Sequence, residues 1–451
     1  MINNPLSIYG KPVKEYNGEG VLLLTNGTEI SCSFIAGQLS DGDIRLFCDT
    51  ISISGLAPTY KDLDYCSFFG TTDEGHRIWS KDNIIYLPNN HCSYAFSLNE
   101  LIVEPGNLES AHEAIFYIDN FEFYGKTDHN RCLTLSLPEL NKVNIVRVKE
   151  YDTVIRDIRI SRGIDITCKM ILEIPSEIIL TKLECESVEL CLLMSFSRGT
   201  RVQWIYYEIV NGIGDVIYRA HYDATTRPYQ SLSAVIRTTV HGIDDTRKFL
   251  EQTYSTLCSN NTLRAISLRL INSYVDAKEH GYMESHGIKN AVVLEIIKSY
   301  ALSTPSFDIP NYIISEDQFT KLKKSLKETI KENCPGDKTL QNLLFQNACG
   351  INRSTLRQIF SKIFEKIELP FEKNDLALLI ESRNHLVHQG KFYTDSASES
   401  ARRKLPPLES DFAELLFIQN SLDKIMLRLF GYHGNYISCR DPKNFEKNDI
   451  T

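Results

Sequence analysis

The segment HGIDD at positions 241–245, followed by TRKFLEQTYSTL at 246–257, marks the place where the pattern of the sequence changes. Before it, apolar and polar residues alternate with a period near two, which is typical of β-strands. After it, apolar residues recur with a period near 3.6, which is typical of amphipathic helices. We therefore expect HGIDD to form a turn between a β-rich half and a helical half.

Short runs rich in β-branched and aromatic residues fill the first half up to about Arg237, with Gly, Asn, Asp or Pro at the breaks. Such runs predict antiparallel strands joined by tight turns. The runs cover residues 20–37, 43–55, 77–88, 114–125, 131–140, 169–185, 188–196 and 201–212. We expect one large or two small β domains over residues 1–240, with a sandwich or barrel-like architecture.

Helical patterns fill the second half up to Phe430. They cover residues 246–257, 261–279, 289–302, 315–332, 339–348, 354–367, 374–389 and 410–430. Gly390 and Gly431 directly follow the last two, where a left-handed residue would end each helix. These patterns predict an all-α bundle over residues 241–435, so the fold class of the chain is α+β. The tail 436–451, rich in Asn, Asp and Lys, is expected to be mobile.

Composition limits the possible classes of protein. The chain has 451 residues, 42% of them hydrophobic and 24% charged, which is typical of a soluble globular protein with two or three domains. It contains no apolar run of about 18 residues and no signal-peptide pattern at its start, so we expect no membrane span and a cytoplasmic location. The twelve cysteines are scattered without a CxxC pair or zinc-finger spacing, and we expect reduced thiols, no metal and no cofactor.

The segment ESRNHLVHQG at 381–390 contains Arg383, Asn384 and, after three intervening residues, His388. A helical wheel places Arg383 near the centre of an apolar stripe, with Asn384 and His388 at its edge. The stripe consists of Leu376, Leu379, Ile380 and Val387. His385 points to the opposite side and is expected to be an ordinary surface or interface residue. An arginine within an apolar stripe is costly unless it is paired or opens onto a pocket, so the segment is a candidate site.

These residue types suit RNA cleavage without a metal. Such cleavage needs a group that moves the 2′-hydroxyl and leaving-group protons, and a cation that stabilises charge on the phosphate. Histidine transfers protons near neutrality, and the fork of arginine matches phosphate oxygens. His388 lies in the last turn before Gly390, where the helix dipole favours a protonated ring and thus a general acid. Asn384 would orient either partner or hydrogen-bond the phosphate.

Arg383, Asn384 and His388 match the RNxxxH signature of the HEPN superfamily, whose ribonucleases carry it late in a helix of a four- or five-helix core. The helical region from about 246 to 430 resembles that domain. A β-rich half before an Apea-like HEPN domain also looks like the ApeA-type proteins of bacterial anti-phage defence. The resemblance implies a dimer with a composite active site, products with a 2′,3′-cyclic phosphate and a 5′-hydroxyl, and a cellular RNA such as tRNA as substrate. It further implies a β domain that gates a toxic, abortive activity, with a phage-derived trigger.

Glu295 lies on a helix with apolar residues on nearly every side, so we expect it to be buried and to need a cation. HEPN domains often place an acidic residue on an earlier helix close to the motif, which makes Arg383 one candidate partner and leaves others open. The resemblance therefore implies that Glu295 supports the site formed by Arg383, Asn384 and His388.

Because the net charge is −9, any RNA-binding surface must be a local patch. Lys324, Lys327 and Lys331 share one helix face, although a solvated surface stripe mixed with Glu is the favoured explanation of that face. The loop triplet Arg402, Arg403 and Lys404 follows the motif helix, and Phe392 and Tyr393 nearby could stack on a base.

Alternatives remain for the motif and for the chain. Arg383 and His388 also fit a surface arginine and a histidine that caps a helix end. The helical half also fits a non-catalytic HEPN module that binds RNA or a nucleotide or assembles a partner. A third alternative is a β-type carbohydrate or ligand binder with a helical dimerisation domain, for which Arg198, Arg201 and Trp204 are candidate contacts.

Overall fold

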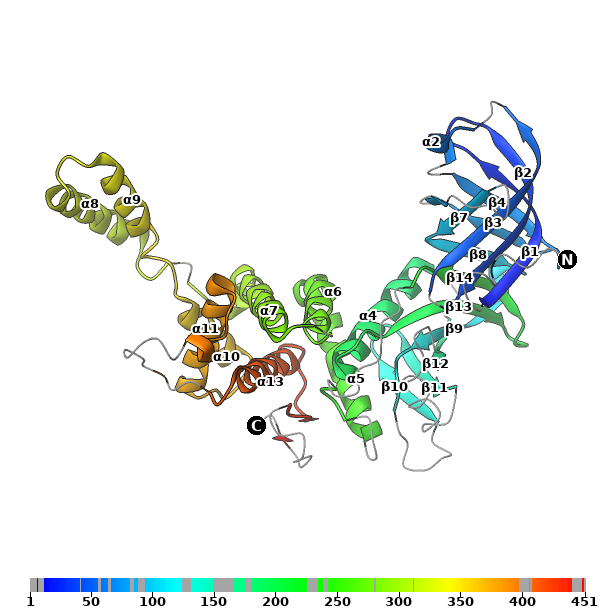
Figure 1. The fold of residues 1–451 in the computed structure, drawn as a ribbon. Coiled ribbons are helices and arrows are strands. Elements are labelled where there is room, and N and C mark those ends of the chain that lie inside the picture. The colour runs from blue at the N-terminus through cyan, green and yellow to red at the C-terminus, as the bar shows by residue number, and fades with distance from the viewer. Residues whose placement is uncertain are drawn as a thin grey trace. The chain divides into compact units, whose positions relative to one another are not determined.

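The computed structural model describes Leu6 and residues 12–40, 42–55, 58–63, 66–81, 85–87, 94–123, 131–148, 166–174, 180–224, 234–237, 242–279, 281–310, 312–396, 405, 408–439 and 448–449. The chain divides into two compact units, whose helices and strands are labelled in Figure 1. The first unit is Met1–Ser259 with Gly434–Ile437, and the second is Asn260–His433 with Ser438–Thr451. An antiparallel β region followed by a helical region confirms the predicted α+β class.

Within the described residues, the first unit contains one antiparallel sheet of fourteen strands, ordered β10-β11-β12-β9-β13-β14-β8-β5-β4-β1-β2-β3-β7-β6. The strands are β1 (Pro12–Leu23), β2 (Glu29–Leu39), β3 (Ile44–Ser54), β4 (Ser67–Thr72), β5 (Arg77–Ser80), β6 (Ile85–Leu87), β7 (Tyr94–Leu98), β8 (Glu100–Glu104), β9 (Ala111–Asp119), β10 (Cys132–Leu137), β11 (Asn141–Arg147), β12 (Ile166–Glu173), β13 (Gln203–Asn211) and β14 (Val216–Tyr222). Alternate side chains of β2, from Ile30 to Ala36, are buried because successive strand residues point to opposite faces.

The sheet bends over on itself. β1 and β14 are separated by three strands in the sheet order, yet the Tyr16 hydroxyl on β1 lies 2.9 Å from Nε2 of His221 on β14. Gln38 on β2 also donates from Nε2 to the Tyr222 carbonyl at 2.8 Å. These contacts require opposite parts of the sheet to face one another, which encloses a polar cluster inside the first unit.

The segment 188–196, predicted as a strand, is instead part of helix α4 (Leu180–Arg198). Periodicity cannot separate a buried strand from a buried helix when apolar residues occur on every side. Here Leu190, Leu193, Met194 and Phe196 are all buried, and Leu and Met are strong helix formers. The prediction of a strand was therefore wrong. The nineteen residues of α4 form one continuous helix instead.

The segment HGIDD is also not a turn throughout, since α5 (Gly242–Ser259) begins at Gly242. This helix clusters with the β region, and the two compact units divide at residue 260. Glu251 accepts a hydrogen bond from the backbone N–H of Ser136 at 2.9 Å, and the ring of Phe249 packs 5.8 Å from that of Phe196 on α4. The packing of the apolar face of α5 against the β region thus places this helix in the first unit.

The second unit consists of helices at the predicted places, with ends that differ by a few residues. They are α6 (Asn261–Asp276), α7 (Met283–Ser303), α8 (Glu316–Asn333), α9 (Lys338–Cys349), α10 (Leu356–Lys366), α11 (Lys373–Gln389), the short α12 (Tyr393–Ser396) and α13 (Asp411–Leu429). Helix α7 packs against α6, α10, α11 and α13. That central position explains why α7 is apolar on nearly every side.

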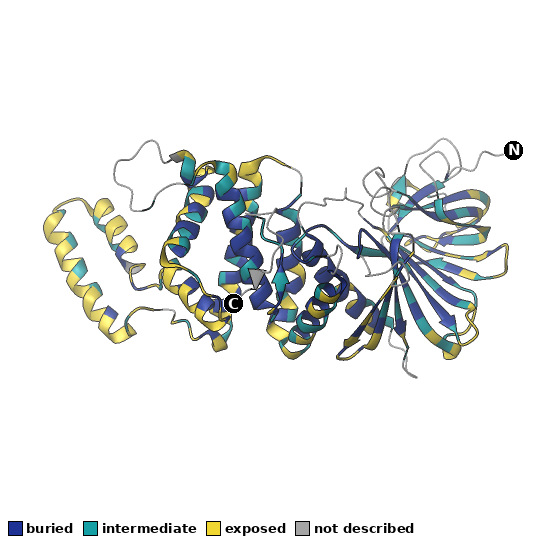
Figure 2. Ribbon diagram, turned by 90° about the horizontal axis from the view of Figure 1, so that it is seen from below, coloured by how far each residue is buried: buried dark blue, intermediate teal, exposed yellow. Residues whose placement is uncertain are grey.

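Helices α8 and α9 pack against each other and are exposed along most of their length, as the colours of Figure 2 show. Only Phe319 of α8 is buried among its described side chains. Within the described residues, no helix is both long enough and apolar enough to cross a membrane.

The start of the predicted mobile tail is packed. Tyr436 is buried, and Asn435–Tyr436 forms strand β15. The Ser438 hydroxyl donates to Oδ1 of Asn420 at 2.8 Å. An aromatic side chain and several polar groups of Tyr436–Cys439 thus have packing or hydrogen-bond partners.

Candidate active site

The motif helix α11 ends as the sequence predicts. Gly390 follows its last residue with a φ of 68°, in the left-handed region, and its N–H donates to the Leu386 carbonyl at 3.1 Å. Glycine reaches this conformation without a Cβ clash. The cap places His388 in the last turn of the helix.

Arg383 is held by two neighbours. Its Nη2 donates to Oε1 of Glu295 on α7 at 2.6 Å, and its Nη1 donates to Oδ1 of Asn384 at 3.0 Å. The side chain is 14% exposed, and its buried Nε has no hydrogen-bond partner among the described residues. The arginine is thus oriented, and one of its donors is left without an acceptor.

Glu295 pairs with Arg383, as one of the sequence hypotheses held, but it is less buried than expected. Its side chain is 30% exposed, and its other oxygen accepts from Nζ of Lys298. Lys298 was not singled out in the sequence, although it lies one helical turn after Glu295, where such a pair forms. The carboxylate therefore holds two cations, one on each helix.

The wheel misplaced the buried stripe of α11. The buried side chains are Leu376, Leu378, Leu379, Ser382 and Leu386. Arg383 consequently lies at the edge of the stripe and not at its centre, while Val387 is 42% exposed. The predicted stripe left out Leu378 and Leu386, which are buried together with the small Ser382 on the face that packs against the neighbouring helices.

Asn384 is half-buried, and His388 is exposed. No hydrogen bond or ion pair of His388 is found within the described part of the chain. His385 is half-buried and packs edge-on against Tyr393, with ring centroids 5.3 Å apart, which fits the structural role expected for it. Five residues along an α-helix separate Arg383 from His388 by about 7.5 Å and about 140° of rotation. Within one copy of α11, the side chains of Arg383 and His388 therefore point to different sides of the helix.

An apolar surface surrounds this face. Ile288 and Val292 on α7 are exposed, as is Val387 on α11, and the two helices pack together. We call these three residues the apolar rim. They lie within one or two turns of Glu295 or Arg383, so the ion pair opens onto a surface with exposed hydrocarbon.

The predicted RNA-binding residues are not gathered at the motif. Lys324, Lys327 and Lys331 are exposed on α8, which packs against α9, whereas α11 packs against α7, α10, α12 and α13. Lys327 places its Nζ 5.4 Å from the ring centre of Phe345 on α9. The triplet Arg402, Arg403 and Lys404 lies outside the described residues.

Phe392 and Tyr393 are buried, so the idea that they stack on a base is wrong. Phe392 is 1% exposed and lies against Gly287 of α7, where an added Cβ would come within 3.1 Å of its ring. The buried carboxylate of Glu414 accepts from the backbone N–H groups of Tyr393 and Thr394 at 2.9 and 2.8 Å. The loop after α11 is thus fixed to α7 and α13.

In the first unit, Arg198 is also structural. It is buried and forms an ion pair with the equally buried Glu122 at 2.5 Å. A desolvated arginine that already has a carboxylate partner offers no exposed group to a ligand. This contact removes Arg198 from the candidate ligand-binding residues.

No protein-family model, no curated protein and no solved structure matches this chain. Among the described residues, no group of three or more His, Cys, Asp or Glu side chains is arranged to hold a metal ion. The chemical groups available at the motif are therefore a guanidinium, an amide, an imidazole and a carboxylate.

Proposed function

We propose that this chain is a metal-independent endoribonuclease of the HEPN type. The observation that carries the proposal is the pairing of Arg383 with Glu295 across two packed helices, on the helix that also exposes the imidazole of His388. The partly buried ion pair fixes the guanidinium, and the unpartnered Nε of Arg383 gives it a remaining donor. An oriented cation and a free imidazole, brought together at one phosphate, are the minimum set for phosphodiester transesterification.

In this reaction the 2′-oxygen of one nucleotide attacks the adjacent phosphorus and loses its proton to a base. The bond from phosphorus to the 5′-oxygen breaks, and that oxygen receives a proton. His388 transfers these protons, Arg383 stabilises the charge on the phosphate, and Asn384 orients the arginine. The products carry a 2′,3′-cyclic phosphate and a 5′-hydroxyl. The bonds and protons of this reaction balance without a metal ion.

The active site is completed by a second copy of the chain. Arg383 and His388 of one α11 diverge by about 140°, so two copies that face each other supply the cation and the imidazole from different subunits. The apolar rim of Ile288, Val292 and Val387 gives such a pair a surface to bury. Val292→Asp and Val387→Asp should convert the dimer to a monomer in sedimentation analysis and abolish cleavage, while α-helical content is retained.

The biological role that fits is an abortive anti-phage defence in the cytoplasm. A nuclease that cuts cellular RNA such as tRNA needs restraint. The β-rich unit is the part of the chain available for that gating. A phage-derived trigger would act on that unit. The resemblance to ApeA-type proteins supports this role.

The deciding experiment expresses the wild type, Arg383→Ala and His388→Ala, and analyses total RNA in buffer with EDTA. We expect cleavage by the wild type and a loss of at least about 100-fold in each variant, the usual contribution of a proton-transfer or charge-stabilising group. Gln389→Ala is the matched control, because it alters the exposed neighbour of His388 and should leave cleavage intact. Persistent cleavage by His388→Ala, or cleavage that EDTA abolishes, would refute the mechanism.

A non-catalytic HEPN module is the alternative that one observation favours. Glu295 and Asn384 already occupy both terminal nitrogens of Arg383, as in a purely structural ion pair. Glu295→Gln separates the two functions. A supporting role predicts reduced cleavage with a folded chain, whereas a structural role predicts lower stability and no cleavage by any version of the protein.

A further inference from the structure

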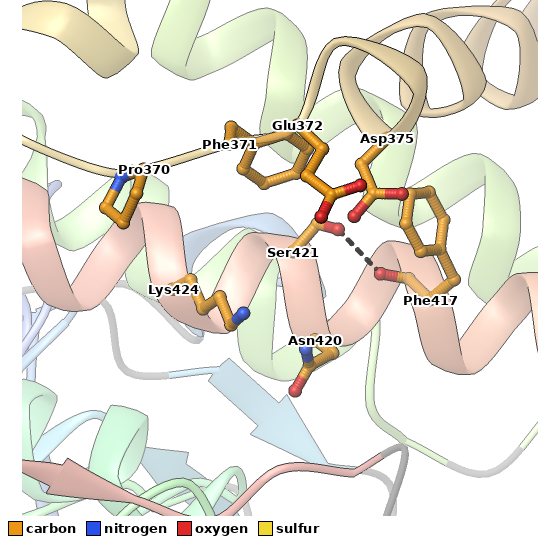
Figure 3. A pocket seen from close by; sticks show the side chains of 8 residues that line it. All are labelled: Pro370, Phe371, Glu372, Asp375, Phe417, Asn420, Ser421 and Lys424. Carbon is orange, nitrogen blue, oxygen red and sulfur yellow. Dashed lines mark hydrogen bonds between the residues drawn. The ribbon is translucent and has the colours of Figure 1, made fainter. Parts of the chain in front are cut away.

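The second unit contains a cavity of about 440 Å³ at the N-terminal end of α11, away from the motif at its C-terminal end. It lies between α11, the segment before it and α13 (Figure 3). Small-molecule sites usually measure about 300–1,000 Å³, so the space suits a ligand at the small end of that range. Nothing in the proposed ribonuclease chemistry uses it.

Two carboxylates line one side of the cavity. Glu372 precedes α11 and Asp375 lies in its first turn, and Figure 3 draws the two carboxyl groups close together. A helix N-terminus attracts carboxylates, which often cap it, but the Glu372 side chain makes no capping hydrogen bond. Neither carboxylate has a hydrogen bond or ion pair within the described residues. The rings of Phe371 and Phe417 also line the cavity, next to these groups.

The opposite side of the cavity is built from α13 and presents donors. Asn420 is only 6% exposed, and its Oδ1 is used by the Ser438 hydroxyl. Its Nδ2 has no hydrogen bond within the described residues, and the side chain lines the cavity. Lys424 adds a positive charge on the same side. This amide N–H is a donor that an acceptor in the cavity could use.

This separation of charge decides the chemistry of the ligand. Paired carboxylates flanked by aromatic rings bind an ammonium or guanidinium group through ion pairing and cation–π attraction. An amide N–H beside a lysine binds a carboxylate. A bare divalent cation fits less well, since Lys424 repels it and the nitrogen of Asn420 cannot coordinate it.

We propose that this cavity binds a zwitterionic, amino-acid-sized ligand with a cationic side chain. Its guanidinium or ammonium group contacts Glu372 and Asp375 between the two phenyl rings. Its carboxylate accepts from Nδ2 of Asn420 near Lys424. The site is independent of the proposed ribonuclease activity, because none of its residues belongs to the motif.

Isothermal titration of the full chain with L-arginine tests the proposal. We expect saturable 1:1 binding, at least about tenfold weaker binding of citrulline, which lacks the charge, and weaker binding of agmatine, which lacks the carboxylate. The double variant Glu372→Gln/Asp375→Asn should weaken L-arginine binding by at least about tenfold. Both side chains are unpaired, so these near-isosteric changes should leave the helical circular dichroism unchanged.

Glu381→Gln is the matched control, since it neutralises an exposed carboxylate on the same helix outside the cavity. It should bind L-arginine like the wild type. The proposal is overturned if neither L-arginine nor L-lysine binds at millimolar concentration, or if the double variant binds as tightly as the wild type. Binding of Mg²⁺ alone, lost in the double variant, would also overturn it in favour of a cation site.

Discussion

Buried His221 makes the stability of the first unit depend on pH. Gln38 donates from Nε2 to the carbonyls of Tyr222 and Ile205, so its Oε1 faces Nδ1 of His221, which therefore carries the proton. Nε2 of His221 accepts from the Tyr16 hydroxyl, which itself accepts from Arg219 at 3.1 Å. The neutral ring thus has both nitrogens satisfied, and a second proton would displace Tyr16 as a donor.

Burial, together with the positive charges of Arg219 and Lys14, lowers the pKa of His221 to about 3. In the unfolded chain the pKa is about 6.5. Between these values the unfolded chain binds a proton that the folded chain does not, so stability is lost as the pH falls from about 6.5 toward about 3. At pH 5 this loss amounts to about 2 kcal/mol, from 1.5 pH units at about 1.4 kcal/mol each.

The assay is denaturant unfolding followed by tryptophan fluorescence at pH 7.5 and pH 5. Both tryptophans of the chain, Trp79 and Trp204, lie in the first unit, so the signal reports that unit. His221→Gln lowers stability at pH 7.5 but should lose about 2 kcal/mol less than the wild type between the two pH values. The exposed His112→Gln on β9 is the matched control and should follow the wild type. Equal pH dependence of His221→Gln and wild type would refute the reasoning.

Three further substitutions probe the packing. Arg198→Met leaves the buried carboxylate of its partner alone and should cost about 3–5 kcal/mol, seen as a lower midpoint of fluorescence-detected unfolding. Gly390→Ala puts a Cβ on a residue with φ of 68° and should lower the free energy of unfolding by about 1 kcal/mol in a circular dichroism melt. Gly287→Ala brings a Cβ within 2.7 Å of Leu386 and should lower the free energy of unfolding by about 1–3 kcal/mol, because it separates α7 from α11. Gly281→Ala is its control: the nearest atom to that Cβ lies at 3.5 Å, so the free energy of unfolding should not change.

The sequence by itself determined the order of the two regions and most of the helices. A period of 3.6 is a local property, and the cap at Gly390 is specified by one residue that tolerates a positive φ. Local pattern failed where burial was complete, as in α4, because a segment that is apolar on every side has no period to detect. It also cannot assign α5 to a unit, since that helix is placed by what it packs against.

For the candidate site, the sequence supplied the residue types and their spacing, and Glu295 as one possible partner of Arg383. Only the tertiary structure showed that Arg383 pairs with Glu295 and that Lys298 shares the same carboxylate. It also showed that Arg383 lies at the edge of the buried stripe, and that Phe392 and Tyr393 are buried. The physical reason is that a helix in isolation specifies which residues share a face. The neighbouring helices decide which of these faces is removed from water. They also decide which charged side chain finds a partner.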